Sequence, residues 1–360
     1  MPANDMPLMH PGQPVRTWLS GVAFLYGWIV RLRQWCYGRG WCASSRLPCR
    51  VVSVGNLTVG GTGKTPVVIA LANWLRAEGR RVAVLSRGYK RVKGAEHLLV
   101  SDGTRILVGP DEAGDEPFLI ARRCPETIVA VGADRASLGR WVLACHAVDC
   151  IILDDGFQHL GLQRDVDVVL LDATDAAGLD AMVPAGRLRE PFSGLGRATA
   201  VVITRVESRN DVEAIYGRLR AAGLPYHDAI EVSFTPESLV SVQDEQVQPL
   251  EWARGKKAWL VSGIGNSQSF RRSAELSGIT VVGETAFQDH YRYQADDINQ
   301  IRADGQSTGV DVVLTTEKDA GKLSSLLQPQ DSWWALRIRA EMIRGEERLR
   351  SLVAGEQGKA

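Results

Sequence analysis

Short apolar runs rich in β-branched residues recur along the chain after residue 48, with helically spaced stretches between several of them. The first set of runs covers residues 50–54, 82–85, 127–131, 150–153, 166–171 and 200–204. The helical stretches cover residues 66–78, 116–123 and 135–145. Near-continuous apolar strands that alternate with helices are typical of a mostly parallel sheet covered on both faces. The pattern therefore predicts an α/β fold.

A second set of the same kind follows further along the chain. Apolar runs at residues 257–261, 280–282 and 310–315 accompany helical stretches at 267–276 and 296–303. Between the two sets, residues 232–252 are polar, contain Pro236 and Pro249, and indicate a connection or a small ribbon. We therefore predict two α/β domains, a larger one at residues 48–225 and a smaller one with its linker at residues 226–345.

The N-terminal part, residues 1–47, has a different pattern. Residues 17–30 are uncharged and rich in aromatic side chains, with Arg16 before them and Arg31 and Arg33 after them. This stretch is shorter than the roughly 20 apolar residues that a helix needs to cross a bilayer. We expect a membrane-surface helix whose aromatic residues lie among lipid headgroups. A helix packed on the protein's own core, a true span and a signal peptide remain as alternatives.

The overall charge is balanced, with 42 Lys plus Arg against 42 Asp plus Glu. A general nucleic-acid binder usually carries a basic excess, so we expect no nucleic-acid partner. The balance hides one asymmetry, because no acidic residue occurs between Asp5 and Glu78 whereas several arginines do. The six cysteines form no C-x-x-C pair and no cluster at zinc spacing. That pattern favours reduced thiols in a cytosolic protein.

A glycine-rich loop follows the first predicted strand. Residues 55–66 read GNLTVGGTGKTP, and a helix-compatible run follows at once. The string matches the end of the P-loop pattern G-x-x-x-x-G-K-[ST], although Thr58 stands at the first glycine position. We expect a loop that holds the phosphates of ATP, with Lys64 on the β- and γ-phosphates and the Thr65 hydroxyl on Mg²⁺. Its residues are Thr58, Val59, Gly60, Gly61, Thr62, Gly63, Lys64 and Thr65.

Two carboxylates, Asp154 and Asp155, end an apolar run, which is the Walker-B arrangement for holding Mg²⁺. Ligands of open α/β sheets lie at the carboxyl ends of the strands, so this pair is expected to face the phosphate loop. Which of the two contacts the metal directly is left open. A further acidic string, GDEP, opens a predicted helix with Asp115. Its residues alone fit a helix N-cap as well as a catalytic carboxylate.

Together these motifs resemble those of the tetraacyldisaccharide 4′-kinase family, the lipid A 4′-kinases of Gram-negative bacteria. In chain order the strings are VGNLTVGGTGKTP, SRGY, GDEP, DDGFQH, PAGRLREP, FQDHYRY and TTEKDA. The resemblance runs in order from about residue 15 to about residue 325. The resemblance implies two α/β/α sandwich domains joined by a short β linker, the larger of P-loop NTPase type. Two positions depart from the family pattern, Tyr291 where a second histidine is frequent and Gly321 where an aliphatic residue is usual.

The resemblance also implies an activity, namely transfer of the γ-phosphoryl group of ATP to the 4′-hydroxyl of a tetraacylated glucosamine disaccharide 1-phosphate. This reaction is a late step of lipid A biosynthesis. The implied location is the cytosolic face of the bacterial inner membrane, bound peripherally, and we expect a monomer. The family pairs the GDEP aspartate with the DHxxY histidine near the acceptor hydroxyl, which corresponds to Asp115 and His290. Asp115 is then the expected general base, His290 orients it, and Lys64 stabilises the transferring phosphoryl group.

Four arginines are candidates for binding the substrate 1-phosphate or the transition state, namely Arg87, Arg135, Arg187 and Arg189. Since His290 lies in the second predicted domain, a shared site would require the domains to close on the substrate.

Two other classes of protein remain possible at this stage. A nucleotide-dependent switch or metal-insertion GTPase shares the glycine-rich loop, but the sequence lacks an N-K-x-D-type string that would read guanine. A non-catalytic membrane-anchored module would explain the N-terminal segment, yet it leaves Lys64, Asp154 and Asp155 without a role.

Overall fold

A computed structural model describes residues 13–89, 91, 94–226 and 228–355, the side chains of residues 13–17 excepted. Its strands are β1 (Arg50–Asn56), β2 (Val82–Ser86), β3 (His97–Asp102), β4 (Ile128–Gly132), β5 (Cys150–Asp154), β6 (Val166–Asp172), β7 (Ala200–Thr204), β8 (Ile230–Ser241), β9 (Val247–Gln248), β10 (Lys257–Ser262), β11 (Thr280–Ala286), β12 (Val312–Thr316) and β13 (Trp333–Arg344). Its α-helices are α1 (Gln13–Gly38), α2 (Lys64–Ala77), α3 (Pro110–Ala113), α4 (Asp115–Arg123), α5 (Arg135–Cys145), α6 (Arg209–Ala221), α7 (Ser267–Leu276), α8 (Ala295–Thr308), α9 (Glu317–Leu323) and α10 (Glu346–Ala354).

The first part of the chain builds a sheet in the order β8-β7-β6-β1-β5-β2-β4-β3. β1 pairs in parallel with β5 and β6, and β2 pairs in parallel with β4 and β5. Only the edge strand β3 runs antiparallel to its neighbour β4 within this part. The expected mostly parallel α/β sheet is thus confirmed. Because β1, β5 and β2 are neighbours, the loops after their carboxyl ends meet at one edge.

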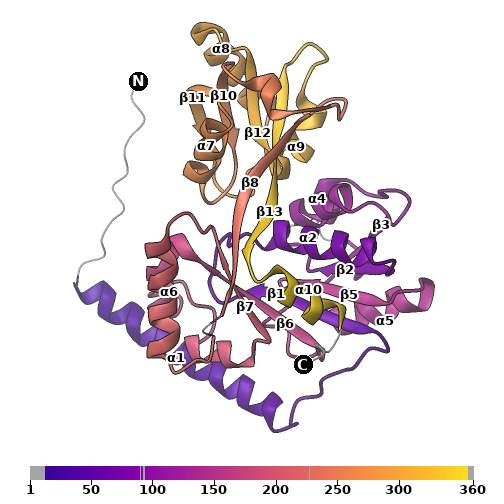
Figure 1. Cartoon of the computed structure of the whole chain (residues 1–360), viewed down its shortest axis with the longest axis vertical. Helices are drawn as coiled ribbons and strands as arrows, with labels where there is room; N and C mark the ends of the chain where they lie inside the picture. The colour runs from indigo at the N-terminus through magenta and orange to yellow at the C-terminus, as the bar shows by residue number, and fades with distance from the viewer. Residues whose placement is uncertain (1–12, 90, 92–93, 227, 356–360) are drawn as a thin grey trace.

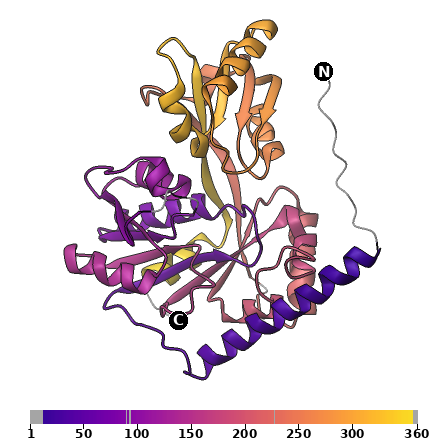
Figure 2. The same ribbon diagram turned by 180° about the vertical axis from the view of Figure 1, so that it is seen from behind.

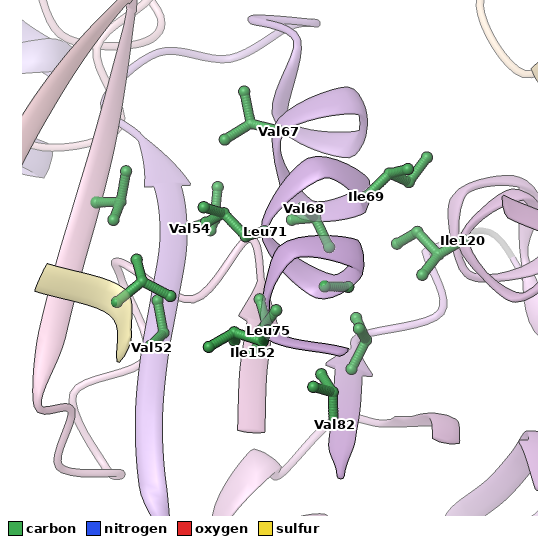
Figure 3. Close-up of a cluster of buried hydrophobic side chains, with 14 of the residues drawn as sticks. Val52, Val54, Val67, Val68, Ile69, Leu71, Leu75, Val82, Ile120 and Ile152 are labelled. Carbon is green, nitrogen blue, oxygen red and sulfur yellow. The ribbon is translucent and has the colours of Figure 1, made fainter. Parts of the chain in front are cut away.

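Helix α2 anchors the phosphate loop to this sheet. Its apolar face carries fully buried residues that pack against β1, β2 and β5, as Figure 3 shows. The residues of this contact include Val67, Val68, Leu71 and Leu75 on the helix and Val52, Val54, Val82 and Ile152 on the strands. Each fully buried Leu or Val contributes about 2 kcal/mol of hydrophobic stabilisation. The start of α2, where the phosphates would bind, is therefore held firmly relative to the strand ends.

A second, smaller part contains β11, β10, β12 and β13, paired in parallel, with α7, α8 and α9 around them. In the segment expected to be a connection or a small ribbon, residues 232–241 belong to the long strand β8, which pairs antiparallel with the short strand β9. β8 also pairs antiparallel with β13. Figure 1 shows these two strands running from one part into the other. The chain then returns to the first part, since Leu349 and Val353 of α10 lie in the core beneath α2. Division into domains at residues 47/48, 225/226 and 345 stays a prediction.

Helix α1 extends along the outer edge of the first part (Figures 1 and 2). It is longer than the expected stretch at residues 17–30, and one of its faces contacts the protein through Ala23 and Tyr26. In the part of the chain that the structure describes, no helix is long and apolar enough to cross a membrane.

Candidate active site

The phosphate loop connects β1 to α2 through two glycines in the left-handed region, Gly60 with φ of 105° and Gly63 with φ of 81°. Thr58 is not among the residues with positive φ and forms an antiparallel bridge with Leu188. Any residue can adopt that extended conformation, so the phosphate loop can form without the first glycine of the motif. Thr65 is the second residue of α2, and Lys64 is the first.

A second segment, residues 187–189, lies along the phosphate loop and fixes its shape. The backbone N–H of Val59 donates to the carbonyl of Arg187, and that of Arg189 donates to Leu57. The Arg187 guanidinium donates to the carbonyl of Val59 and pairs with Asp175 at 2.8 Å. On the other flank, Thr204 and Arg205 donate to the carbonyls of Thr62 and Gly61. The loop is thus held from both sides.

Asp154 and Asp155, at the end of β5, occupy different surroundings. The Asp154 carboxylate is buried and accepts a hydrogen bond of 2.9 Å from Ser86 at the end of β2. Asp155 lies 3.5 Å from the Lys64 ammonium and 2.8 Å from the Arg189 guanidinium. Both cations also meet the side-chain oxygen of Asn56. Of the strand-end pair expected to face the phosphate loop, Asp155 thus contacts the loop lysine, whereas Asp154 contacts Ser86.

These surroundings set the protonation of the pair. Burial raises the pKa of Asp154 to about 6, and the charges of Glu116 and Asp155 add to the shift. Burial also disfavours ionisation of Asp155, but Lys64 and Arg189 outweigh it and lower its pKa to about 2. Asp155 also adopts a left-handed backbone conformation, with φ of 53°, which costs a non-glycine residue about 1 kcal/mol.

Asp115 and His290 meet across the two parts of the molecule. The Nδ1 atom of His290 lies 2.9 Å from Oδ2 of Asp115, although 175 positions separate them in the chain. Asp115 begins α4, and its side chain makes no hydrogen bond that would cap the helix. His290 follows β11 with φ of 63°, another left-handed residue. The pair expected from the family resemblance thus exists without any further closure of the two parts.

Two lysines of α9 complete this cluster. Lys322 lies 3.2 Å from Oδ2 of Asp115, and Lys318 lies 3.3 Å from Nε2 of His290. Burial alone would raise the pKa of Asp115, but the hydrogen bond from His290 and the charges of both lysines lower it. Asp115 is therefore ionised at neutral pH. Neither lysine was predicted as a site residue, although both lie in or beside the TTEKDA string.

The Asp115 cluster adjoins the carboxylates of the metal-binding candidates. Gly114 packs against the loop after β2, where a Cβ would lie 3.2 Å from the carbonyl oxygen of Tyr89. That loop follows Ser86, which binds Asp154, and Glu116 is close enough to affect the pKa of Asp154. The two groups of residues therefore border one region at the carboxyl ends of β2 and β5.

The four candidate arginines fall into two kinds. Arg187 and Arg189 are bound to the phosphate loop and to carboxylates, as described above. Arg135 is buried, its Nε has no hydrogen-bond partner among the described residues, and burial lowers its pKa. Arg87 is exposed, and its charge contributes to the shift of Arg135. Arg135 and Arg87 are the pair with donors available to an anion. Sequence reasoning did not name Asn56 and Ser86 as site residues, although both lie in strings that carry the family resemblance and at the ends of β1 and β2.

The chain is similar to known proteins over most of its length. The family described as Tetraacyldisaccharide-1-P 4′-kinase matches residues 15–356. A tetraacyldisaccharide 4′-kinase of Anaeromyxobacter sp. is 39% identical over 313 residues, which cover 87% of this chain and 84% of that protein. The enzyme of the same name from Geobacter sulfurreducens is 39% identical over 305 residues, covering 85% and 83%.

One solved structure resembles the whole chain. LpxK from Aquifex aeolicus, crystallised in complex with ATP, superposes with a TM-score of 0.75 and 33% sequence identity. The match covers 95% of this chain and 99% of that one. This chain therefore shares its fold with a protein that was crystallised with ATP.

Proposed function

This chain belongs to the tetraacyldisaccharide 4′-kinase family, the ATP-dependent kinases of lipid A biosynthesis, and we propose how its residues carry out the transfer. The reaction moves the γ-phosphoryl group of ATP to the 4′-hydroxyl of the acylated disaccharide 1-phosphate. The contact between Asp115 and His290 carries the proposal, because it unites residues from both parts beside the nucleotide loop. Family membership also favours a kinase over the switch GTPase and the non-catalytic anchor left open by the sequence.

In the proposed reaction, Asp115 accepts the proton of the 4′-hydroxyl. The 4′-oxygen bonds to the γ-phosphorus while the bond from that phosphorus to the bridging oxygen of ADP breaks, and Asp115 later releases its proton to water. A carboxylate with a lowered pKa is a weak base. Phosphoryl transfer passes through a loose transition state, in which the position of the nucleophile counts for more than its deprotonation. Asp115 is therefore suited to orienting the hydroxyl and receiving a late proton.

Lys64 and the N–H groups of residues 60–65 would bind the β- and γ-phosphates at the start of α2. Arg135, whose Nε has no hydrogen-bond partner among the described residues, and the exposed Arg87 are our candidates for binding the transferring phosphoryl group or the substrate 1-phosphate.

The residues present also fit Mg²⁺, which prefers one or two carboxylates together with phosphate oxygens and water. Asp154 is buried and forms no ion pair with any described residue, whereas Asp155 is already paired with Lys64 and Arg189. We therefore assign direct contact to Asp154, with the Thr65 hydroxyl, and contact through water to Asp155. When bound, the ion would neutralise charge that develops on the phosphates.

The test is phosphoryl transfer from γ-labelled ATP to the tetraacyldisaccharide 1-phosphate. We expect Asp115→Asn and Lys64→Ala to lower kcat at least about 100-fold. The matched control is Asp111→Asn, an exposed acid on α3 that should leave kcat unchanged. Wild-type transfer rates in Asp115→Asn would overturn the assignment of the base. Nucleotide hydrolysis without any lipid labelling would overturn the lipid-kinase activity itself.

A separate proposal concerns α1, which we place on the cytosolic membrane surface. Its outward face carries large apolar residues, with 70% of Trp18, 74% of Phe24 and 54% of Trp28 exposed. A contiguous apolar stripe of this size marks an interaction surface. Its aromatic composition and the adjoining Arg31 and Arg39 suit an anionic bilayer.

Vesicle co-sedimentation tests this surface. Phe24→Gln combined with Trp28→Gln should reduce binding to vesicles with anionic lipid by about tenfold or more, while transfer to a dispersed short-chain acceptor stays unchanged. Equal binding of the variant and the wild type would contradict a membrane role for this face.

A further inference from the structure

We propose that Lys318 and Lys322 of α9 are positioning residues for phosphoryl transfer. Lys318 fixes His290 as a neutral ring with its proton on Nδ1, and Lys322 turns Asp115 so that Oδ1 is left for the acceptor hydroxyl. The inference rests on the proposed function, because it assigns Asp115 the role of base.

Lys318 determines which ring nitrogen of His290 carries the proton. Its ammonium lies 2.8 Å from Oδ1 of Asp289 and 3.3 Å from Nε2 of His290. An ammonium can only donate hydrogen bonds, so Nε2 must be the unprotonated, accepting nitrogen. Nδ1 then carries the proton and donates to Oδ2 of Asp115 at 2.9 Å.

Lys318 is held in its charged form by neighbouring acids. Burial lowers its pKa, but Glu116, 3.8 Å away, and the hydrogen bond to Asp289 outweigh it and raise the pKa. Among the described residues, the other groups that face His290 do not approach Nε2 to hydrogen-bond distance. Glu116 and Asp289 approach it only to 3.9 and 3.8 Å, and the ring of Tyr89 lies edge-on with its centroid at 5.5 Å.

Lys322 contacts three oxygen atoms through its ammonium group. It donates hydrogen bonds to Oδ2 of Asp115 at 3.2 Å and to the carbonyl oxygen of Tyr291 at 3.1 Å, and it forms an ion pair with Oδ1 of Asp319 at 3.1 Å. The side chain is only 9% exposed, so these contacts are shielded from water.

The two oxygens of the Asp115 carboxylate therefore have different surroundings. Among the described residues, the hydrogen bonds to Asp115 come from His290 and Lys322, and both reach Oδ2. Oδ1 is therefore the oxygen that remains for the hydroxyl. Because His290 has its proton directed at Asp115, it acts as a donor that orients the base and takes no proton from the substrate.

The tautomer can be measured directly. In protein labelled with ¹⁵N-histidine, long-range ¹H–¹⁵N spectra distinguish protonated from unprotonated ring nitrogens, and His290→Gln identifies the signals of His290. We expect the wild type to show Nδ1–H and an unprotonated Nε2. We expect Lys318→Met to shift His290 toward the Nε2–H form or the doubly protonated ring. A wild-type ring protonated on Nε2 would overturn the inference, whatever the variants do.

Kinetics supply the second measurement. Lys318→Met and Lys322→Met should each lower kcat about 10- to 100-fold with the KM for ATP unchanged, because only the acceptor side is misplaced. Lys318→Arg, which keeps a charged donor, should recover part of the loss. The matched control is Lys257→Met, an exposed lysine of β10. If Asp115→Asn is inactive while Lys318→Met and Lys322→Met retain wild-type kcat, the inference is wrong and the proposed base survives. If Asp115→Asn is fully active, the proposed base is wrong and the catalytic role of both lysines with it.

Discussion

Asp154 and Asp155 are adjacent in the chain, yet their surroundings move their pKa values in opposite directions, to about 6 and about 2. The difference arises because the Asp154 carboxylate is buried and forms no ion pair with any described residue, whereas Asp155, with its left-handed backbone, pairs with Lys64 and Arg189. Two neighbouring carboxylates thus have different effects on stability. Ionisation of Asp154 lowers the free energy of unfolding, whereas ionisation of Asp155 raises it.

The first prediction is that Asp154→Asn stabilises the metal-free protein at pH 8. The pKa of Asp154 lies above its unfolded value of 3.8, so its favourable contribution is complete below that value and is lost as pH rises through 6. Replacing the acid should recover up to about 3 kcal/mol at pH 8 and almost nothing at pH 4. Urea unfolding in the presence of EDTA at the two pH values measures this difference.

Asp155→Asn is the matched comparison and should destabilise the protein at pH 8. Its lowered pKa means that the stabilisation is present above pH 3.8 and is lost as pH falls through about 2. Equal shifts of the same sign in both variants would show that the two environments are not different.

Much of this site could be predicted because several of its residues lie in short sequence motifs. A strand, a glycine turn and a helix start occur together at residues 50–66, and two acids end another apolar strand, so Lys64, Asp154 and Asp155 could be assigned from short strings. The nine strands expected from apolar runs are all present. The strands β8 and β13 were harder to predict because they cross between the two parts, where polar residues replace an apolar run.

The rest of the site depends on contacts that no local pattern contains. Asp115 has the same local sequence whether it caps α4 or meets His290, and 175 positions separate the pair. Lys318 and Lys322 acquire their partners only when α9 packs beside α4. Family resemblance supplied the pairing of Asp115 with His290, but the roles of the two lysines required coordinates.

A second prediction concerns Gly63 and Phe234. A Cβ on Gly63 would lie 2.1 Å from the ring of Phe234, which belongs to β8, the strand that joins the two parts. Gly63→Ala should therefore raise the KM for ATP by tenfold or more, through both this clash and the positive φ. Adding Phe234→Ala should relieve the clash and restore part of the affinity, which titration calorimetry with a non-hydrolysable ATP analogue would measure. No recovery in the double variant would mean that backbone strain alone causes the defect.

The third prediction concerns Glu190, which joins α1 to the nucleotide loop. Its buried carboxylate accepts hydrogen bonds from Gln34 of α1, from Gln158 and from Arg197. Glu190→Leu would leave the half-buried Arg197 without its counter-charge, so we expect a loss of about 3 kcal/mol in unfolding free energy. Gln34→Leu removes one hydrogen bond and should cost only about 1 kcal/mol. Thermal unfolding of both variants tests this order, and a larger effect for Gln34→Leu would contradict it.

The last prediction concerns Gly321, one of the two positions that depart from the family pattern. A Cβ on Gly321 would lie 3.0 Å from the ring of Phe118, where α9 packs against α4. Ion pairs join the two helices on either side of this contact, Asp115 with Lys322 at 3.2 Å and Arg123 with Glu317 at 2.6 Å. Because residue 321 has no side chain, the ring of Phe118 fits between the two helices, which the two ion pairs hold together.

Gly321→Val should push α9 away from α4 and lengthen the contacts of Asp115 with Lys322 and His290. Because displacements of about 1 Å can cost 100-fold in rate, we expect kcat to fall 10- to 100-fold while the KM for ATP stays the same. Phe118→Ala introduced with it should restore most of kcat, since the valine then occupies the space of the ring. Gly217→Ala, in α6 with no atom near the added Cβ, is the control and should leave kcat unchanged. A Gly321→Val enzyme with wild-type kcat would show that the spacing of these two helices does not position Asp115.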